Sequence, residues 1–232
     1  ANVANCLQRQ LPDAKQPAGG PMNPGLMLMQ NWINFPMCLF RIPLYQSVGG
    51  FSEDAGSATD WDWQLRCLDA SAQYTFVNET LVTHHWHGDN YCLQAGAPAY
   101  TGIIERMRTG RYENISRLVA ALRAEAGGFH RAGNFRMAEP MYGRVLEIDP
   151  GDGEVWALAG QLAAQMGNAG LAVERLNKAV ALNPSNAGAL YHIAALYAAL
   201  GDRVNACLML ERTLQAEPGH ALALQALRSL PT

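Results

Sequence analysis

Three prolines divide the second half of the chain at equal intervals. Pro150, Pro184 and Pro218 recur every 34 residues, and from Gly110 onward alanine and leucine dominate while strand patterns stop. Proline cannot continue a helix, so each of these prolines marks the end of a helical segment. An interval of this length holds two helices and a turn. It therefore constrains the second half of the chain to a stack of similar helical hairpins.

The residues inside each interval resemble the tetratricopeptide repeat (TPR). In the interval from Gly153 the matching positions are Trp156, Ala159, Gly160, Ala163, Gly167, Ala172, Leu176 and Ala179. Small residues let the two helices of a hairpin approach closely, and large ones fill the space between neighbours. A glycine ends each first helix (Gly133, Gly167 and Gly201), where a left-handed backbone is common.

We expect three such repeats and a capping helix within residues 111–232. The repeats begin near Val119, Gly153 and Ala187, and residues 221–230 form the cap. Pro140 lies inside the second helix of the first repeat, where we expect a kink or a late start.

TPR arrays bind peptides or partner proteins along a concave groove. The resemblance therefore implies a protein or peptide partner, with Asn186, Tyr191 and His192 among the groove residues on the first helices. The alternative is that these side chains pack or face solvent, and that the array only braces the rest of the chain.

The first half of the chain differs in composition and in its residue patterns. Residues 1–25 are rich in Pro, Gly, Asn and Gln and predict a loop. Residues 37–40, 73–77 and 80–84 predict short strands. Residues 60–70 predict a helix that buries Trp61, Leu65 and Leu68 on one face. Strands, a helix and glycine turns in succession indicate an α/β layer.

Four short motifs follow one another between residues 37 and 90. They are Cys38-Leu39-Phe40-Arg41, Val48-Gly49-Gly50-Phe51-Ser52-Glu53, Asp60-Trp61-Asp62-Trp63-Gln64-Leu65-Arg66 and His85-Trp86-His87-Gly88-Asp89-Asn90. Their order and spacing resemble the C-terminal half of family-2 glycosyltransferases with the GT-A fold. The resemblance implies an α/β remnant of a GT-A domain at residues 26–110, fused to an all-α TPR domain at residues 111–232.

The resemblance also implies an inverting transfer of a sugar from a nucleotide donor. One carboxylate must deprotonate the acceptor hydroxyl. By motif position this general base is Asp60, with Asp62 in reserve, and His87 binds the diphosphate or its metal. The implied substrate-binding residues are Arg41, Gly49, Gly50, Glu53 and Trp61.

Both carboxylates also have a structural alternative. Asp60 at a helix start can cap the backbone N–H groups. Asp62 and Arg66 stand four residues apart with the acid first, which favours a surface ion pair.

The GT-A fold places its nucleotide pocket and acidic metal motif in its N-terminal half. The 36 residues before Met37 are too few for the βαβ units that hold a nucleotide. The complete enzyme would use a nucleotide-sugar donor and Mg²⁺ or Mn²⁺, and would transfer a hexosyl group to a glycan, lipid-linked or protein acceptor. We expect neither cofactor on this chain, which alone would be inactive.

Two further interpretations compete with the transferase. The first is a non-enzymatic TPR scaffold that binds a protein partner. The second rests on His85-x-His87-x-Asp89, which resembles the zinc motif of metallo-β-lactamases. That family places another His directly after the Asp, where this chain has Asn90.

Composition limits the partners and the compartment. The net charge is −3 with no basic run, so we expect no nucleic-acid partner. The longest nearly apolar stretch, residues 193–200, is too short to cross a bilayer. The five cysteines are scattered and form no CxxC pair, which favours reduced thiols and a cytoplasmic location.

Overall fold

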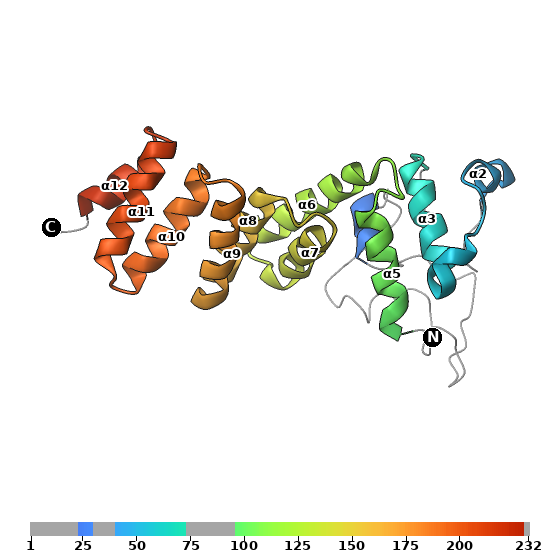
Figure 1. Cartoon of the computed structure of the whole chain (residues 1–232), viewed down its shortest axis with the longest axis horizontal. Helices are drawn as coiled ribbons and strands as arrows, with labels where there is room; N and C mark the ends of the chain where they lie inside the picture. The colour runs from blue at the N-terminus through green and yellow to red at the C-terminus, as the bar shows by residue number, and fades with distance from the viewer. Residues whose placement is uncertain (1–22, 30–39, 73–95, 230–232) are drawn as a thin grey trace. The chain divides into compact units, whose positions relative to one another are not determined.

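A computed structural model describes residues 23–29, 40–72 and 96–229. All regular structure in these ranges is helical. The chain divides into two compact units, residues 1–122 and residues 123–232, and Figure 1 labels their helices. None of the described helices has the length and apolar character that crossing a membrane requires.

The first unit is built around α3 (Thr59–Asp69). Its other elements are η1 (Pro24–Leu28), α2 (Ile42–Ser47), η3 (Glu53–Ala58), α5 (Gly96–Arg108) and the first part of α6 (Ile115–Arg131). Its core contains Met27, Leu28, Trp61, Trp63, Leu65, Leu68, Ile103, Met107, Leu118 and Leu122. Gly25 lies so close to α6 that a Cβ there would stand 2.3 Å from the backbone nitrogen of Leu122.

The helix predicted at residues 60–70 is confirmed as α3. Trp61, Leu65 and Leu68 are buried on its inner face, as their spacing indicates.

The predicted α/β class of residues 26–110 is not supported, because the described part of this stretch contains helices and no strand. The predicted strands at 73–77 and 80–84 lie outside the described residues, as do residues 37–39. Phe40, the last residue of the other predicted strand, leads directly into α2 and is not in a strand. Periodicity alone cannot separate a short buried strand from another buried segment, which explains why Phe40 is not in a strand. The strands at 73–77 and 80–84 stay predictions.

The second unit continues α6 with α7 (Phe135–Ile148), α8 (Gly153–Gln165) and α9 (Ala169–Leu182). It ends with α10 (Ala187–Ala199), α11 (Arg203–Ala216) and α12 (Ala221–Ser229). Helices α8 and α9 pack as one hairpin, α10 and α11 as the next, and α12 packs on α11 (Figure 1). Leu176, Ala179, Ala189 and Ile193 form the core between the two hairpins.

The turns of the second unit follow the repeat pattern. Gly133, Gly167 and Gly201 have φ of 75°, 80° and 78°, which confirms the left-handed residues predicted after the first helices. Asp152, Asn168, Asn186 and Asp202 each cap a helix through the side chain.

Two residues mark how the hairpins close. A Cβ at Gly160 would lie 2.7 Å from Cγ of Leu176, so α8 and α9 touch where the sequence places its smallest residue. Helix α7 runs through Pro140. The expected late start is wrong, because the carbonyl of Asn134 already accepts the N–H of Met137 and Ala138, each at 3.2 Å.

Candidate functional site

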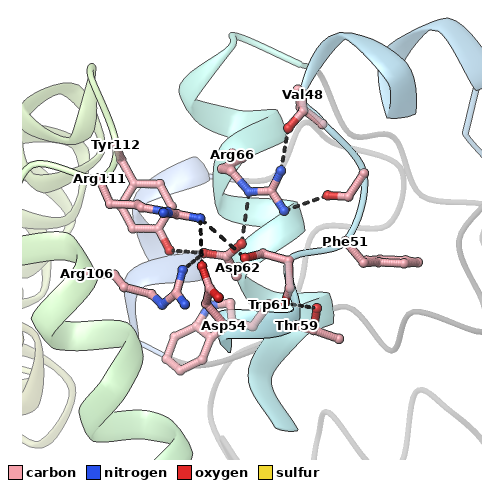
Figure 2. Close-up of polar contacts among 12 residues, drawn as sticks. Val48, Phe51, Asp54, Thr59, Trp61, Asp62, Arg66, Arg106, Arg111 and Tyr112 are labelled. Atoms are coloured by element: carbon pink, nitrogen blue, oxygen red, sulfur yellow. Dashed lines mark hydrogen bonds and ion pairs between the residues drawn. The ribbon is translucent and has the colours of Figure 1, made fainter. Parts of the chain in front are cut away.

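The first unit contains a buried polar cluster of Asp62, Arg66, Arg106 and Tyr112, which we call the Asp62 cluster (Figure 2). The Asp62 side chain is 0% exposed. Its Oδ2 lies 2.9 Å from Nε of Arg66, and its Oδ1 lies 3.3 Å from Nη1 of Arg106. The hydroxyl of Tyr112 donates to Oδ1 at 2.9 Å. One carboxylate therefore serves two cations and a phenol in a water-poor environment.

Arg66 connects this cluster to the glycine turn at residues 48–50. Its Nη2 donates to the carbonyl of Gly50 at 2.6 Å, and its Nη1 donates to the carbonyl of Val48. Gly49 and Gly50 have φ of 81° and 67°. A side chain at Gly50 would also stand 2.9 Å from the Tyr45 ring. Only glycine fits this turn, and Arg66 fixes it to α3.

The electrostatics of the Asp62 cluster favour a structural role. Burial raises the pKa of Tyr112, and the Asp62 carboxylate raises it further. The phenol therefore stays a neutral donor, which suits it to hold Asp62 rather than to exchange protons near neutral pH. The predicted Asp62–Arg66 ion pair is confirmed, but its expected surface position is wrong because Asp62 is fully buried. Arg106 and Tyr112 were not predicted, since they lie 44 and 50 residues away from Asp62.

Asp60, the predicted general base, lies in the first turn of α3 and is half-buried. Its Oδ1 accepts the backbone N–H of Trp61 at 2.8 Å. The N-cap residue of α3 is Ala58. Asp60 is therefore the second residue of the helix, and not its N-cap as the structural alternative expected. The role of Asp60 as a base stays a prediction.

The predicted substrate-binding residues are placed differently from one another. Arg41 is exposed at the N-cap of α2, and Glu53 is exposed at the start of η3. Trp61 is only 2% exposed, and its Nε1 donates to the carbonyl of Met27 at 2.7 Å. Trp61 therefore packs in the core of the first unit, and its predicted role in substrate binding stays a prediction.

His87, the predicted diphosphate or metal residue, lies outside the described residues, together with His85 and Asp89. Within the described ranges no group of three or more His, Cys, Asp or Glu side chains is arranged to hold a metal ion.

The second unit carries a surface hollow of about 520 Å³, which we call the α8–α10 hollow. Its lining is Arg123, Glu154, Ala157, Leu158, Gln161, Asn183, Asn186, Gly188, Ala189 and His192. Most of these residues come from α8 and α10, the first helices of consecutive hairpins. Glu154 and Gly188 occupy equivalent repeat positions, as do Leu158 and His192. The repeat therefore places these side chains in one stripe.

Two of the three predicted groove residues meet in this hollow. Asn186 lines it while its Oδ1 accepts the N–H of Ala189 at 2.9 Å, so the same side chain also caps α10. His192 lines it too, and burial lowers its pKa, helped by the nearby His220 and His130. Tyr191 does not line the hollow: its ring lies against that of His220, tilted by 33°, with the centroids 5.0 Å apart. Arg123, Glu154 and Gln161 were not predicted, although the repeat positions could have identified Glu154.

Comparison with known proteins places a tetratricopeptide repeat in the second unit. The family model for this repeat matches residues 153–186, which are α8, α9 and their flanking turns. That match covers none of residues 26–110, so it gives no support to a glycosyltransferase half. No curated protein matches the chain.

Several solved structures are similar to this chain. The first TPR of Spaghetti (RPAP3) bound to an HSP90 peptide is 24% identical, with a TM-score of 0.46, covering 48% of this chain and 89% of that one. The TPR domain of Arabidopsis OM64 is 13% identical, with a TM-score of 0.47 and coverage of 49% and 94%. The O-GlcNAc transferase of Thermobaculum terrenum is 32% identical, with a TM-score of 0.45 and coverage of 47% and 21%.

Proposed function

We propose that the second unit binds an extended segment of a partner protein in the α8–α10 hollow, and that this chain works as a protein-interaction module. The observation that carries the proposal is the stripe of repeat-equivalent side chains that lines one hollow on consecutive first helices. Concave surfaces of this kind are where helical repeats take up extended partners.

The packing of the unit supports a binding role for these side chains. The hairpins are held together by buried small and apolar residues such as Leu176, Ala179 and Ile193, none of which lines the hollow. Gln161 and His192 are only half-buried and Asn183 is exposed, so the core does not require them. Polar side chains in a hollow of this volume supply orientation and specificity to a ligand.

Site-specific photo-crosslinking in the full chain tests this proposal. A benzophenone amino acid at Leu158 stands in the hollow, and the same group at Lys178 stands on the exposed side of α9 as the matched control. The expected result is a protein adduct from position 158 that position 178 does not form. Equal adducts from both positions, or none from position 158, would contradict the proposal.

A transferase is the second candidate function, and one observation favours it. Arg66 binds the carbonyls of Val48 and Gly50 while it pairs with Asp62, so two of the four motifs meet in one place (Figure 2). In this proposal the general base is Asp60, which is half-exposed and lies with Asp62 in the first turn of α3.

The coding DNA upstream of Ala1 tests the transferase proposal directly. A continuous open frame that encodes a strand-rich segment with an Asp-x-Asp motif is the expected result. A stop codon immediately upstream would rule out the enzyme and leave the interaction module as the account of this chain.

A further inference from the structure

The two charged residues that line the α8–α10 hollow, Arg123 and Glu154, pair with each other. Of its ten lining residues only Arg123 and Glu154 carry a full charge at neutral pH. Arg123 forms an ion pair with Glu154 through Nη2, and its Nη1 lies 3.3 Å from Oδ2 of Asp152. The single cation of the lining is therefore shared by two carboxylates. His192 adds no charge at pH 7, because burial lowers its pKa.

The hollow has hydrogen-bonding capacity that the fold leaves unused. The Oδ1 atoms of Asn183 and Asn186 accept backbone N–H groups at 3.1 and 2.9 Å. Within the described residues their NH₂ groups have no acceptor, and the Gln161 amide makes no hydrogen bond. Each of these amides can donate to a peptide carbonyl, and that of Gln161 can also accept from a peptide N–H.

Small residues line the hollow together with these amides. Ala157, Gly188 and Ala189 line the hollow with no long side chain, so a polypeptide backbone can approach the helix surface closely. Main-chain groups of a bound segment would then come within reach of the amides.

We propose that the α8–α10 hollow selects an uncharged, extended peptide segment, which it holds by its main chain through Asn183, Asn186 and Gln161. This inference rests on the proposed interaction function and names the class of partner. An acidic segment is disfavoured because it must displace Glu154 or Asp152 from Arg123, and both carboxylates repel it. A basic segment gains little, because Glu154 is already paired with Arg123, while Asp152 is only 16% exposed and accepts from both Arg123 and the N–H of Val155.

A selection experiment with the full chain tests the inference. The probe is a display library of random dodecapeptides, selected on the wild type, on Glu154→Gln and on Gln161→Ala. Glu154 is 70% exposed and Gln161 makes no hydrogen bond, so neither change disturbs the fold. The wild type is expected to enrich peptides depleted in Asp, Glu, Lys and Arg. Glu154→Gln is expected to raise the share of Asp and Glu, because Arg123 loses one of its two partners.

Binding of one selected peptide, measured by fluorescence anisotropy, gives the second readout. Gln161→Ala is expected to weaken it roughly tenfold, whereas Lys178→Ala, outside the hollow, leaves it unchanged. Affinity should change by less than about twofold between 50 and 500 mM NaCl, because no net charge is paired on binding.

Different results would contradict the peptide selectivity and the interaction function. Enrichment of acidic peptides by the wild type, or a steep loss of affinity with salt, would overturn the selectivity and leave the interaction function intact. Absence of any enriched peptide, or binding that Gln161→Ala and Leu158→Asp both leave unchanged, would overturn the interaction function itself.

Discussion

The hydroxyl of Tyr112 donates to Asp62 across 2.9 Å, although the two residues are 50 positions apart. The bond joins the segment after α5 to the first turn of α3. Arg66 and Arg106 converge on the same carboxylate from two helices. Asp62 is thus the shared acceptor on which the polar core of the first unit depends.

Replacing Asp62 with Asn is expected to lower the free energy of unfolding of the first unit by about 3–5 kcal/mol. The change leaves two largely buried guanidinium groups without their carboxylate, and burial of an uncompensated charge is costly. Urea unfolding followed by tryptophan fluorescence measures the effect, because Trp61 and Trp63 lie in α3 beside the altered residue.

Asp54→Asn is the matched control for this change. Asp54 also faces an arginine, Arg111 at 4.0 Å, but its side chain is 76% exposed. Exposed pairs contribute little, so the expected loss is below about 1 kcal/mol. Equal losses from both variants would show that burial of Asp62 does not set the strength of the cluster.

Replacing Tyr112 with Phe removes one hydrogen bond to a charged group and is expected to cost about 1.5–3 kcal/mol at pH 8. Burial raises the pKa of Tyr112 above its ordinary value of 10.0. The stability that the neutral phenol contributes is therefore fully present below about pH 10 and is lost as the pH rises beyond it. The difference in free energy of unfolding between wild type and Tyr112→Phe should shrink from pH 9.5 to pH 11.5. A constant difference across this range would contradict the assignment.

The second unit could be predicted from the sequence far better than the first. Its period and its left-handed Gly133, Gly167 and Gly201 are local patterns that repeat, so each one supports the next. The polar core of the first unit depends on contacts of Asp62 with Arg106 and Tyr112, which are 44 and 50 residues away. Local residue spacing cannot predict contacts between residues so far apart in the sequence. A single sequence therefore predicted the Asp62–Arg66 pair and missed its burial.

In the candidate groove, too, the sequence predicted some positions and missed others. Asn186 and His192 could be placed because the repeat fixes which helix and which position they occupy. Tyr191 is the neighbour of His192 in sequence, yet it turns toward His220, since adjacent residues on a helix point about 100° apart. Arg123 in α6 pairs with Glu154 of α8 and with Asp152, the N-cap residue of α8, and sequence spacing cannot reveal these contacts.

Replacing Gly160 with Ala is expected to destabilise the second unit by about 1–3 kcal/mol, because the new methyl group would stand 2.7 Å from Cγ of Leu176. Gly128→Ala in α6 is the matched control: nothing lies within 4 Å of its Cβ, and the change should stabilise by up to about 1 kcal/mol through helix propensity. Thermal unfolding by circular dichroism compares the two variants. Stabilisation by both would mean that α8 and α9 have room to separate at Gly160.

Replacing His192 with Gln is expected to make the chain less sensitive to acid. Burial lowers the pKa of His192 in the folded state, so the unfolded chain binds the proton more readily. The stability that neutral His192 contributes is present above its unfolded pKa of about 6.5 and is lost as the pH falls through the lower folded value. Urea midpoints at pH 7.5 and pH 5 should therefore fall further for wild type than for His192→Gln. His130, whose pKa burial also lowers, is present in both proteins and cancels in the comparison. An equal fall for the two proteins would mean that His192 is solvated in the hollow.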